Sequence, residues 1–450
     1  MSVFADIDWR EVGREAGEVL AEYLRIDTTN PPGNERAAME FLAALLARDG
    51  VESELLAQDP ARPNLLARLR GAGREPALVL LHHADVVPAG PGWSVEPFAG
   101  VERDGWLWGR GALDCKSLGV MHLFALRLLA RLEVPLEREV WLLSVSDEER
   151  GGGAGAQWLC REHAGLFSEA SDLLGEGGVG LQMPNGESLW LPSYAEKGIL
   201  WLELSAQGGG GHAALGGSGP AERVARVLAR LSEKAPEVFI TPEAERNLRS
   251  LAGRARFPLS LLLSRPRSPL TRRLVRSAAR KNEWARTLMC TTMAVTSLEA
   301  GAAENQLPTS CRAILDCRLH PADRREACLA RVAEEASREG VTVRETLYAP
   351  PSRSPVDTPL FSILTETLRR LGPTPHVAPA LFPGTTDNRF FRELGLCCYG
   401  LLPVMLPFGQ HEVHGPDERI ERSQLERGCR IMAEIVHAAA TARRSQESGA

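Results

Sequence analysis

The chain has 450 residues, 44% of them apolar and 24% charged, an ordinary composition for a protein of two or three globular domains. Its 58 acidic residues outnumber its 52 basic residues, and a net charge of −6 argues against nucleic acid as the main partner. No secretory signal or Cys-x-x-Cys spacing is visible, and no apolar run approaches the ~18–20 residues of a membrane span. We therefore expect a cytoplasmic protein with reduced thiols and no transmembrane segment.

The first 194 residues alternate between helical and strand patterns. Apolar residues recur at helical spacing over 12–25, 36–48 and 118–132. Two continuous apolar runs, 77–81 and 139–145, are typical of strands covered on both faces of a sheet. We predict an α/β catalytic domain with a mixed sheet between helices, and ligand residues just beyond the carboxyl ends of its strands.

Residues 195–350 change to the order strand–helix–strand–strand–helix–strand. The expected elements are, in turn, 198–206, 220–234, 287–298, 313–319, 321–338 and 341–347. This order predicts a ferredoxin-like α+β domain that interrupts the catalytic domain. The α/β pattern resumes with a helix over 360–371, so the catalytic domain is expected to comprise 1–194 and 351–450.

An extra segment at 240–288 lies inside the inserted domain and is strongly basic. It contains the apolar run 257–263 and the arginines Arg246, Arg249, Arg254, Arg256, Arg265, Arg267, Arg272, Arg273, Arg276 and Arg280. Three interpretations are open: an apolar cover for an acyl group, an amphipathic segment for a membrane surface or an anionic partner, and a solvated helical hairpin. We favour the solvated hairpin, whose arginines face water.

Five short stretches carry imidazole and carboxylate side chains that suit divalent metal ions. They are 83–88, 109–116, 147–152, 176–178 and 414–418. The candidate ligands in them are His83, Asp114, one of the adjacent Glu148 and Glu149, Glu176 and His414. Such ligands favour zinc, cobalt or manganese. Two of these ions about 3.5–4 Å apart can activate water and polarise a carbonyl together.

The local spacing suggests a role for several of these residues. His83 and Asp85 are two apart, so at a strand end the Asp85 carboxylate can accept a hydrogen bond from the second ring nitrogen of His83. Asp114 follows a Gly-Arg-Gly turn, where its two oxygens can bridge two cations. Glu148 and Glu149 point in opposite directions on extended backbone, which suits one metal ligand and one general base.

Together these stretches resemble the aminoacylase / carboxypeptidase S / acetylornithine deacetylase family of two-zinc amidohydrolases and exopeptidases, over essentially the whole chain. The resemblance implies two divalent ions, zinc first, with cobalt or manganese as alternatives. It implies that His83, Asp114 and Glu176 hold one ion. Asp114, Glu149 and His414 would hold the other, with Asp114 as the bridge.

The same resemblance implies catalytic roles beyond the ligands. Glu148 would be the general base, and Asp85 would orient a metal-bound histidine. The peptide bond Asp114–Cys115 would be cis. His212 would reach the active site of a partner subunit and stabilise the oxyanion of the tetrahedral intermediate.

Substrate-binding residues are also implied by the resemblance, and they are Asn305, Arg318, Gly384, Thr385 and Arg389. Arg389 is the first candidate for the substrate carboxylate, because a guanidinium grips a carboxylate through two bonds. A structural ion pair between Arg389 and Asp387 is the alternative.

We therefore expect metal-dependent hydrolysis of an amide bond next to a free carboxylate, with an N-acyl amino acid or a short peptide as the substrate. Aminoacylase-like deacylation is favoured over carboxypeptidase or dipeptidase activity. A homodimer through the inserted lid and dimerisation domain is also implied, although the extra basic segment leaves a monomer open. A non-catalytic, metal-binding relative is the hypothesis from a different class.

Overall fold

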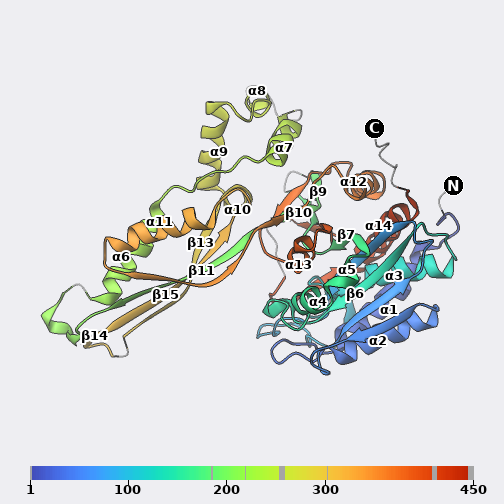
Figure 1. The fold of residues 1–450 in the computed structure, drawn as a ribbon, viewed down its shortest axis with the longest axis horizontal. Coiled ribbons are helices and arrows are strands. Elements are labelled where there is room, and N and C mark those ends of the chain that lie inside the picture. Colours follow the sequence, from blue (N-terminus) through green and yellow to red (C-terminus); the bar gives the residue numbers. More distant parts are fainter. Residues whose placement is uncertain are drawn as a thin grey trace. The chain divides into compact units, whose positions relative to one another are not determined.

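A computed structural model describes residues 3–183, 186–217, 219–252, 259–301, 303–407 and 413–443 (Figure 1). Part of the basic segment, with Arg254, Arg256 and Phe257, lies outside these ranges. The chain forms two compact units. The first comprises Met1–Tyr194, Ser354–Ala380 and Thr386–Ala450, and the second comprises Ala195–Arg353 and Leu381–Thr385.

The first unit is built on a mixed β-sheet with the strand order β1-β2-β6-β3-β7-β19-β10. These strands are β1 (Glu52–Leu56), β2 (Asn64–Leu69), β6 (Arg138–Val145), β3 (Glu75–His83), β7 (Ala170–Gly175), β19 (Cys397–Gly400) and β10 (Ser193–Glu196). Strands β6, β3, β7 and β19 run parallel, whereas β1, β2 and β10 pair antiparallel with their neighbours. The predicted mixed sheet is confirmed.

Neighbouring parallel strands end at the same edge of this sheet, which positions the site. In the register of β3 and β6, His83 lies opposite Val145. In the register of β7 and β19, Gly175 lies opposite Gly400. Loops that leave these strand ends therefore start side by side, as expected for a ligand site in an open α/β sheet.

Helices cover both faces of the sheet. They are α1 (Trp9–Arg25), α2 (Arg36–Arg48), α3 (Lys116–Arg131), α4 (Ala156–Glu162), α5 (Ala164–Phe167), α12 (Pro359–Leu371), α13 (Asn388–Glu393) and α14 (Arg422–Thr441). α3 packs against β3 and α14. The His82 ring lies against Gly119 of α3, so by alternation along β3 the His83 side chain points to the opposite face.

Two small sheets complete the first unit. One has the order β21-β5-β4, formed by β4 (Val101–Arg103), β5 (Trp106–Trp108) and β21 (Arg419–Glu421). The other has the order β20-β8-β9, formed by β8 (Val179–Gln182), β9 (Ser188–Leu191) and β20 (Met405–Pro407). In the second of these sheets β8 begins three residues after Glu176, and in the first β21 begins five residues after His414.

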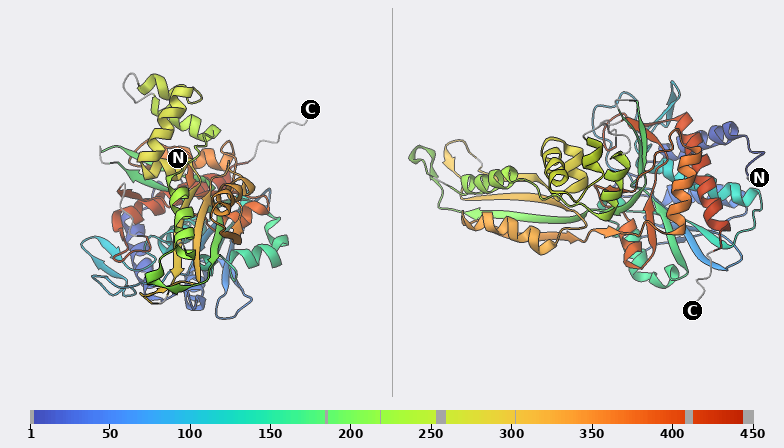
Figure 2. Two further views of the ribbon diagram at one scale, coloured as in Figure 1. Left: turned by 90° about the vertical axis from the view of Figure 1, so that its left-hand side faces the viewer. Right: turned by 90° about the horizontal axis from the view of Figure 1, so that it is seen from above.

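The second unit contains a four-stranded antiparallel sheet in the order β13-β15-β11-β16. Its elements are β11 (Gly198–Gln207), α6 (Pro220–Glu233), β13 (Thr292–Ala300), β15 (Ser310–Leu319), α11 (Arg325–Ser337) and β16 (Thr342–Ala349). α6 and α11 pack against each other and against one face of the sheet (Figures 1 and 2). Alternate β11 residues, from Leu200 to Ala206, form the core beneath them. The predicted ferredoxin-like order is confirmed.

Short elements and a helical group complete the second unit. The short strands β12 (Gly211–His212) and β14 (Gln306–Leu307) pair with each other. Strand β17 (Ser352–Arg353) pairs with Ala195 and Glu196 of β10, and β18 (Ala380–Phe382) also pairs with β10. The basic segment forms α7 (Pro242–Ala252), α8 (Leu259–Leu263), α9 (Pro269–Lys281) and α10 (Glu283–Met289). No helix among the described residues has the length and apolarity needed to cross a bilayer.

Two boundaries in the second unit differ most from the sequence prediction. Residues 287–289 were predicted as strand but belong to α10, because the Asn282 side chain caps this helix by accepting from the Ala285 N–H. The helix predicted from residue 321 begins only at Arg325. A turn precedes it, in which His320 Nδ1 accepts from the Ala322 N–H. In both cases a local hydrogen bond from backbone to a polar side chain, a helix cap at Asn282 and a turn at His320, competes with the predicted element.

Candidate active site

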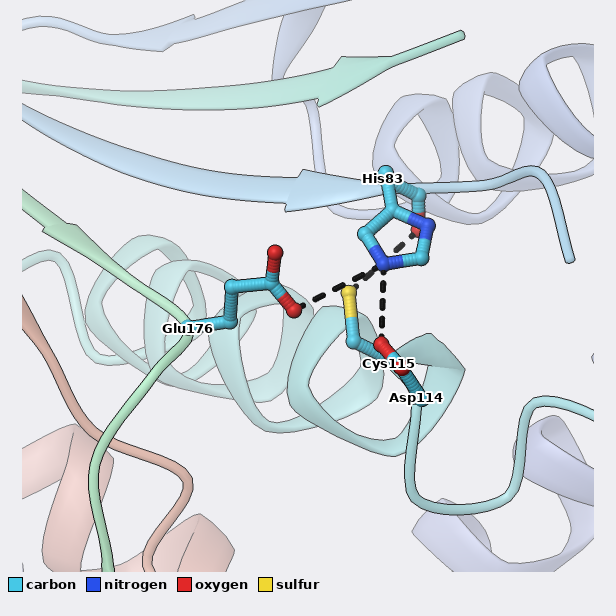
Figure 3. Close-up of side chains that lie close together, drawn as sticks. All are labelled: His83, Asp114, Cys115 and Glu176. Carbon is cyan, nitrogen blue, oxygen red and sulfur yellow. Dashed lines mark hydrogen bonds and ion pairs between the residues drawn. The ribbon is translucent and has the colours of Figure 1, made fainter. Parts of the chain in front are cut away.

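The first ligand group gathers at the end of β3. His83 Nε2 lies 3.0 Å from Asp114 Oδ1 and 3.6 Å from Glu176 Oε2 (Figure 3). His83 is the last residue of β3, Glu176 directly follows β7, and Asp114 lies in the loop before α3. The His83 side chain is only 2% exposed. The structure thus brings together three residues that the sequence placed on one ion.

The second ligand group shares Asp114 with the first. His414 Nε2 lies 3.1 Å from Asp114 Oδ2 and 3.4 Å from Glu149 Oε1. Asp114 therefore presents one oxygen to each group, which is the arrangement expected of a bridging carboxylate. The peptide bond between Asp114 and Cys115 is cis, as predicted.

The donor set of both groups fits divalent cations. In each group, the candidate ligand atoms lie within 4.8 Å of one another. Glu149 Oε1 is buried and lacks a hydrogen-bond donor within the described residues. A buried carboxylate oxygen without a donor is costly unless a cation neutralises it. Histidine and carboxylate ligands match zinc, cobalt and manganese.

Cys115 is a neighbour of the first group that the sequence did not suggest. Its Sγ lies within the same cluster as His83, Asp114 and Glu176 (Figure 3). The thiol is 3.6 Å from the carbonyl oxygen of His83, to which it donates. Burial raises the pKa of the Cys115 thiol strongly. A metal ligand must be the thiolate, so this environment disfavours cysteine ligation.

Replacement of Cys115 with alanine is therefore expected to leave metal binding nearly unchanged. The variant loses a weak S–H donor and a little packing, but keeps every oxygen and nitrogen ligand. Metal content after dialysis and turnover should both stay within about threefold of the parent protein, less than the 10–100-fold typical of lost partners of metal ligands. A complete loss of one ion would identify Cys115 as a ligand.

The adjacent glutamates do not lie on extended backbone, so that part of the prediction is wrong. Glu148–Arg150 form the 3-10 helix η1, which follows Asp147 in the left-handed region at φ 69°. The backbone N–H groups of Glu148 and Glu149 donate to the Asp85 carboxylate, both at 3.1 Å. Their side chains nevertheless diverge. Glu149 faces His414, whereas Glu148 lines a small cavity with His83 and Glu176.

Asp85 contacts His83 through a different atom from the one expected. His83 Nδ1 is 2.8 Å from the backbone oxygen of Asp85, while the nearest carboxylate oxygen is 3.6 Å away. The carboxylate instead accepts from Asn30 Nδ2 at 2.8 Å and from the two glutamate N–H groups. Asp85 therefore couples the end of β3 to η1, and its carbonyl can orient the His83 ring.

Crowding and burial perturb the acids of the site. Burial raises the pKa of the Glu148 carboxyl well above its usual range, and the nearby Glu176 carboxylate adds to the shift. Burial likewise raises the pKa of Glu176 to about 7 and that of Asp387 to about 7. Bound cations would reverse this by favouring the ionised carboxylates.

Metal binding is expected to tighten as pH rises. A hydrogen bond to Asp114 and the Glu149 carboxylate 3.4 Å away raise the pKa of His414 to about 10. Burial opposes protonation of His83, but Cys115 and Glu176 outweigh it and raise its pKa. The His414 ring thus holds a proton at neutral pH and must release it to bind metal, and the raised pKa of His83 favours protonation of that ring as well.

Calorimetric titration of the chelator-treated protein in two buffers of different ionisation enthalpy measures that proton release. For each proton displaced, we expect metal affinity to fall about tenfold for every unit by which the pH is lowered. In His414→Ala, the protons released with the second ion should decrease. Heats that do not depend on the buffer would contradict the expectation.

A buried ion pair supports the Asp114 loop, and sequence reasoning missed its role. Glu418 Oε2 accepts from Arg110 Nη1 at 2.7 Å, and both side chains are almost completely buried. The Glu418 carboxylate also accepts from the backbone N–H groups of Gly111, Leu113 and Asp114, at 3.1, 2.7 and 3.0 Å. Its position in the stretch 414–418 was the only sequence signal available.

Most of the expected substrate residues belong to the second unit. They are His212, Asn305, Arg318, Gly384 and Thr385. The exposed His212 is the neighbour of Ala213, whose N–H donates to the Asn305 carbonyl at 2.9 Å. Arg318 pairs with Asp316 at 3.1 Å, and Thr385 Oγ1 donates to the Lys197 carbonyl at 2.9 Å. The structure therefore brings His212 and Asn305 together.

Arg389 belongs to the first unit, in α13. Its Nη2 donates to the Gly151 carbonyl at 3.3 Å, and its guanidinium lies 4.3 Å from the Phe390 ring centre. The alternative, an ion pair with Asp387, does not occur within the described residues. Both carboxylate oxygens of Asp387 are buried and lack a donor there.

These features define a class of protein. Two histidine–carboxylate groups that share one aspartate lie at the carboxyl edge of a mixed sheet, and a further carboxylate stands beside them. That combination is typical of metal-dependent hydrolases of amide bonds.

Residues 79–438 match Peptidase family M20/M25/M40, and the chain belongs to this family. N-fatty-acyl-amino acid synthase/hydrolase PM20D1 of Homo sapiens is 30% identical over 387 residues, or 82% of this chain and 76% of that protein. Aminoacylase-1A of Rattus norvegicus is 26% identical over 439 residues, or 94% of this chain and 95% of that protein. The predicted family is confirmed.

Solved structures show the same fold. The M20 family metallo-carboxypeptidase Sso-CP2 from Sulfolobus solfataricus has a TM-score of 0.72 at 20% identity, covering 94% of this chain and 98% of that chain. Human carnosine dipeptidase 1 has a TM-score of 0.66 at 17% identity, covering 96% of this chain and 98% of that chain. At these identities the likeness concerns the fold alone.

Proposed function

We propose that the protein hydrolyses N-acyl amino acids with two bound divalent ions, zinc first among them. The observation that carries this proposal is the pair of ligand groups joined by Asp114, with Glu148 beside them. His83, Asp114 and Glu176 would hold one ion. Asp114, Glu149 and His414 would hold the other. When bound, such ions act as Lewis acids and lower the pKa of water.

The protein's own side chains would move the proton and hold the substrate. Glu148 accepts the proton of the attacking water and returns it to the leaving amine, a role that its raised pKa supports. Asp85 keeps Glu148 and Glu149 in place through their N–H groups. Deprotonated amine leaving groups are poor, so this return of the proton completes the cleavage.

Residues of the second unit, together with Arg389, are proposed to bind the substrate. His212, supplied by a second copy of the chain, would donate to the oxyanion. Asn305, Arg318, Gly384, Thr385 and Arg389 would contact the substrate, with the arginines on its carboxylate. This assignment requires a homodimer, which sedimentation velocity would test. We also propose a cytoplasmic location, which fits nine cysteines that form no disulfide among the described residues.

A cavity of about 330 Å³ in the first unit supports an acyl rather than a peptide substrate. Its lining combines apolar side chains with four polar ones, Gln182, Arg419, Glu421 and Gln424, and the apolar residues are Trp106, Leu113, Val404, Met405, Leu406, Pro407 and Ile420. Leu113 immediately precedes the bridging Asp114, and Ile420 lies two residues after Glu418. The volume equals about ten water-sized groups, and a methylene is of similar size, so a medium or long acyl chain would fit.

Filling this cavity is expected to shorten the preferred acyl chain. In Leu406→Trp, the larger side chain should displace about two methylenes and lower kcat/KM for long-chain substrates at least tenfold. N-acetyl substrates should be affected little, and Leu406→Ala serves as the matched control. Equal losses on acetyl and long-chain substrates would place the acyl group elsewhere.

The decisive experiment is an assay of the zinc- or cobalt-loaded protein on N-acyl amino acids, from acetyl to long fatty chains, and on dipeptides. Chelator-sensitive release of a free amino acid from acylated substrates supports the proposal. Cleavage of dipeptides alone would favour the carboxypeptidase or dipeptidase alternative. Stoichiometric metal without turnover on any amide would favour a non-catalytic, metal-binding role.

A further inference from the structure

The helical group α7 to α9 carries a large excess of positive charge. Residues 242–281 contain ten arginines and one lysine but only two glutamates, in a chain whose net charge is −6. Both glutamates lie in α7, where Glu243 pairs with Arg246, and Glu245 pairs with Arg249 and Arg267. Both glutamates of the group therefore pair with arginines in α7 or just before α9.

The arginines of α9 remain without acidic partners. Arg272, Arg273, Arg276 and Arg280 are all exposed. Within the described residues they form no ion pair and no side-chain hydrogen bond. These four guanidinium groups are therefore available to bind an external anion.

α9 also exposes leucines beside these arginines. Only one narrow stripe of the helix is buried, formed by Thr271, Val275 and Ala279. Leu270 is 56% exposed and Leu274 is 41% exposed, one turn apart on a neighbouring row. Leu261 of α8 is 46% exposed. The carbonyl of the next residue, Leu262, accepts from Thr271 Oγ1, so Leu261 lies near the start of α9.

We propose that the exposed side of α9, where Leu270 and Leu274 lie next to Arg273 and Arg280 and Arg276 and Arg272 follow further round the helix, docks the protein on an anionic lipid surface. A helix that combines apolar residues with a basic face lies in the headgroup region of such membranes. Each arginine gains from the surface potential, while the leucines enter the acyl boundary. A nucleic-acid site would use the arginines but would gain nothing from the exposed leucines.

The proposal is independent of the catalytic assignment, because it uses no residue of either ligand group. Of the three interpretations of the basic segment, the exposed leucines and arginines of α9 favour membrane-surface binding over the solvated hairpin. It also suggests an advantage for an enzyme of N-acyl amino acids, since long-chain members of that class partition into bilayers.

Flotation of the full-length protein with lipid vesicles tests the inference. The vesicles are made of phosphatidylcholine alone or of a mixture with anionic phosphatidylglycerol. We expect binding to the mixture only, and a loss of about 100-fold in the triple variant Arg273→Glu/Arg276→Glu/Arg280→Glu. The matched control Arg10→Glu/Arg48→Glu/Arg161→Glu makes the same charge change at exposed arginines of the first unit and should keep its binding.

A second variant separates lipid insertion from simple charge attraction. Leu270→Ser/Leu274→Ser keeps every arginine and should still lose at least tenfold in vesicle binding. Circular dichroism checks that each variant is folded. Equal binding by the parent and the leucine variant overturns the proposal and indicates a general polyanion site. Binding of the parent to polyuridine but not to the vesicles also overturns it.

Discussion

Replacement of Glu148 with glutamine is expected to lower kcat by about a hundredfold to ten-thousandfold while both metal ions stay bound. Glu148 belongs to neither ligand group, but it lines the same small cavity as His83, Glu176 and Asp387. Burial raises its pKa, which favours acceptance of a proton by this carboxylate. Glutamine has nearly the same shape but cannot carry out this transfer. Steady-state kinetics and elemental analysis of the same sample provide the measurement.

The neighbouring glutamate supplies the matched control. Glu149 faces His414 at 3.4 Å and has a buried oxygen without a donor in the described part of the chain. Glu149→Gln should therefore lose the second ion together with turnover. A Glu148→Gln enzyme that retained its full kcat would rule out Glu148 as the base. If both variants lost metal equally, the division of labour between the two residues would be wrong.

The sequence correctly predicted that the Glu148 and Glu149 side chains point in different directions, but it gave the wrong physical reason. Extended backbone would separate the side chains by alternation, but the residues occupy a 3-10 turn. The Asp85 carboxylate holds both backbone N–H groups and so forms this turn. Asp85 thus has a structural task that its spacing from His83 could not reveal. Hydrogen bonds from distant backbone are invisible to pattern analysis.

Elements with strong periodicity were predicted well. The run 77–81 became the centre of β3, and the helices over 36–48 and 360–371 appear with errors of one residue or less. Continuous apolar runs and amphipathic repeats report burial directly, so they survive in the folded protein. Errors arose where a polar side chain capped a helix, as Asn282 does for α10.

Residues that hydrogen-bond or pair with the acids next to the ligand groups could not be predicted from the sequence. Asn30 donates to Asp85 and, at 3.0 Å, to Asp147, which lies 117 positions away in the sequence. Arg62 pairs with the same Asp147 at 2.9 Å. Each of these side chains looks like an ordinary loop residue in the sequence. Only the fold shows that they converge behind the ligand groups.

Replacement of Glu418 with glutamine should cost about 3–5 kcal/mol of stability, because it leaves the buried Arg110 guanidinium without its counter-charge. The same change weakens three backbone hydrogen bonds that hold residues 111–114. Since Asp114 contributes an oxygen to each ligand group, metal affinity should fall about 10–100-fold. Denaturant unfolding of the chelated protein and metal titration measure the two effects separately.

The adjacent acid provides a sharp comparison. Asp417 is half-buried, its carboxylate accepts only from Ser94 within the described residues, and its positive φ is one that asparagine also tolerates, so Asp417→Asn should change neither quantity appreciably. The double variant Arg110→Met/Glu418→Met removes both charges and should be more stable than Glu418→Gln, because no unpaired charge remains buried. It should still bind metal weakly, since nothing then accepts from the loop N–H groups. If the double variant bound metal as tightly as the parent protein, Glu418 would stabilise the fold without positioning Asp114.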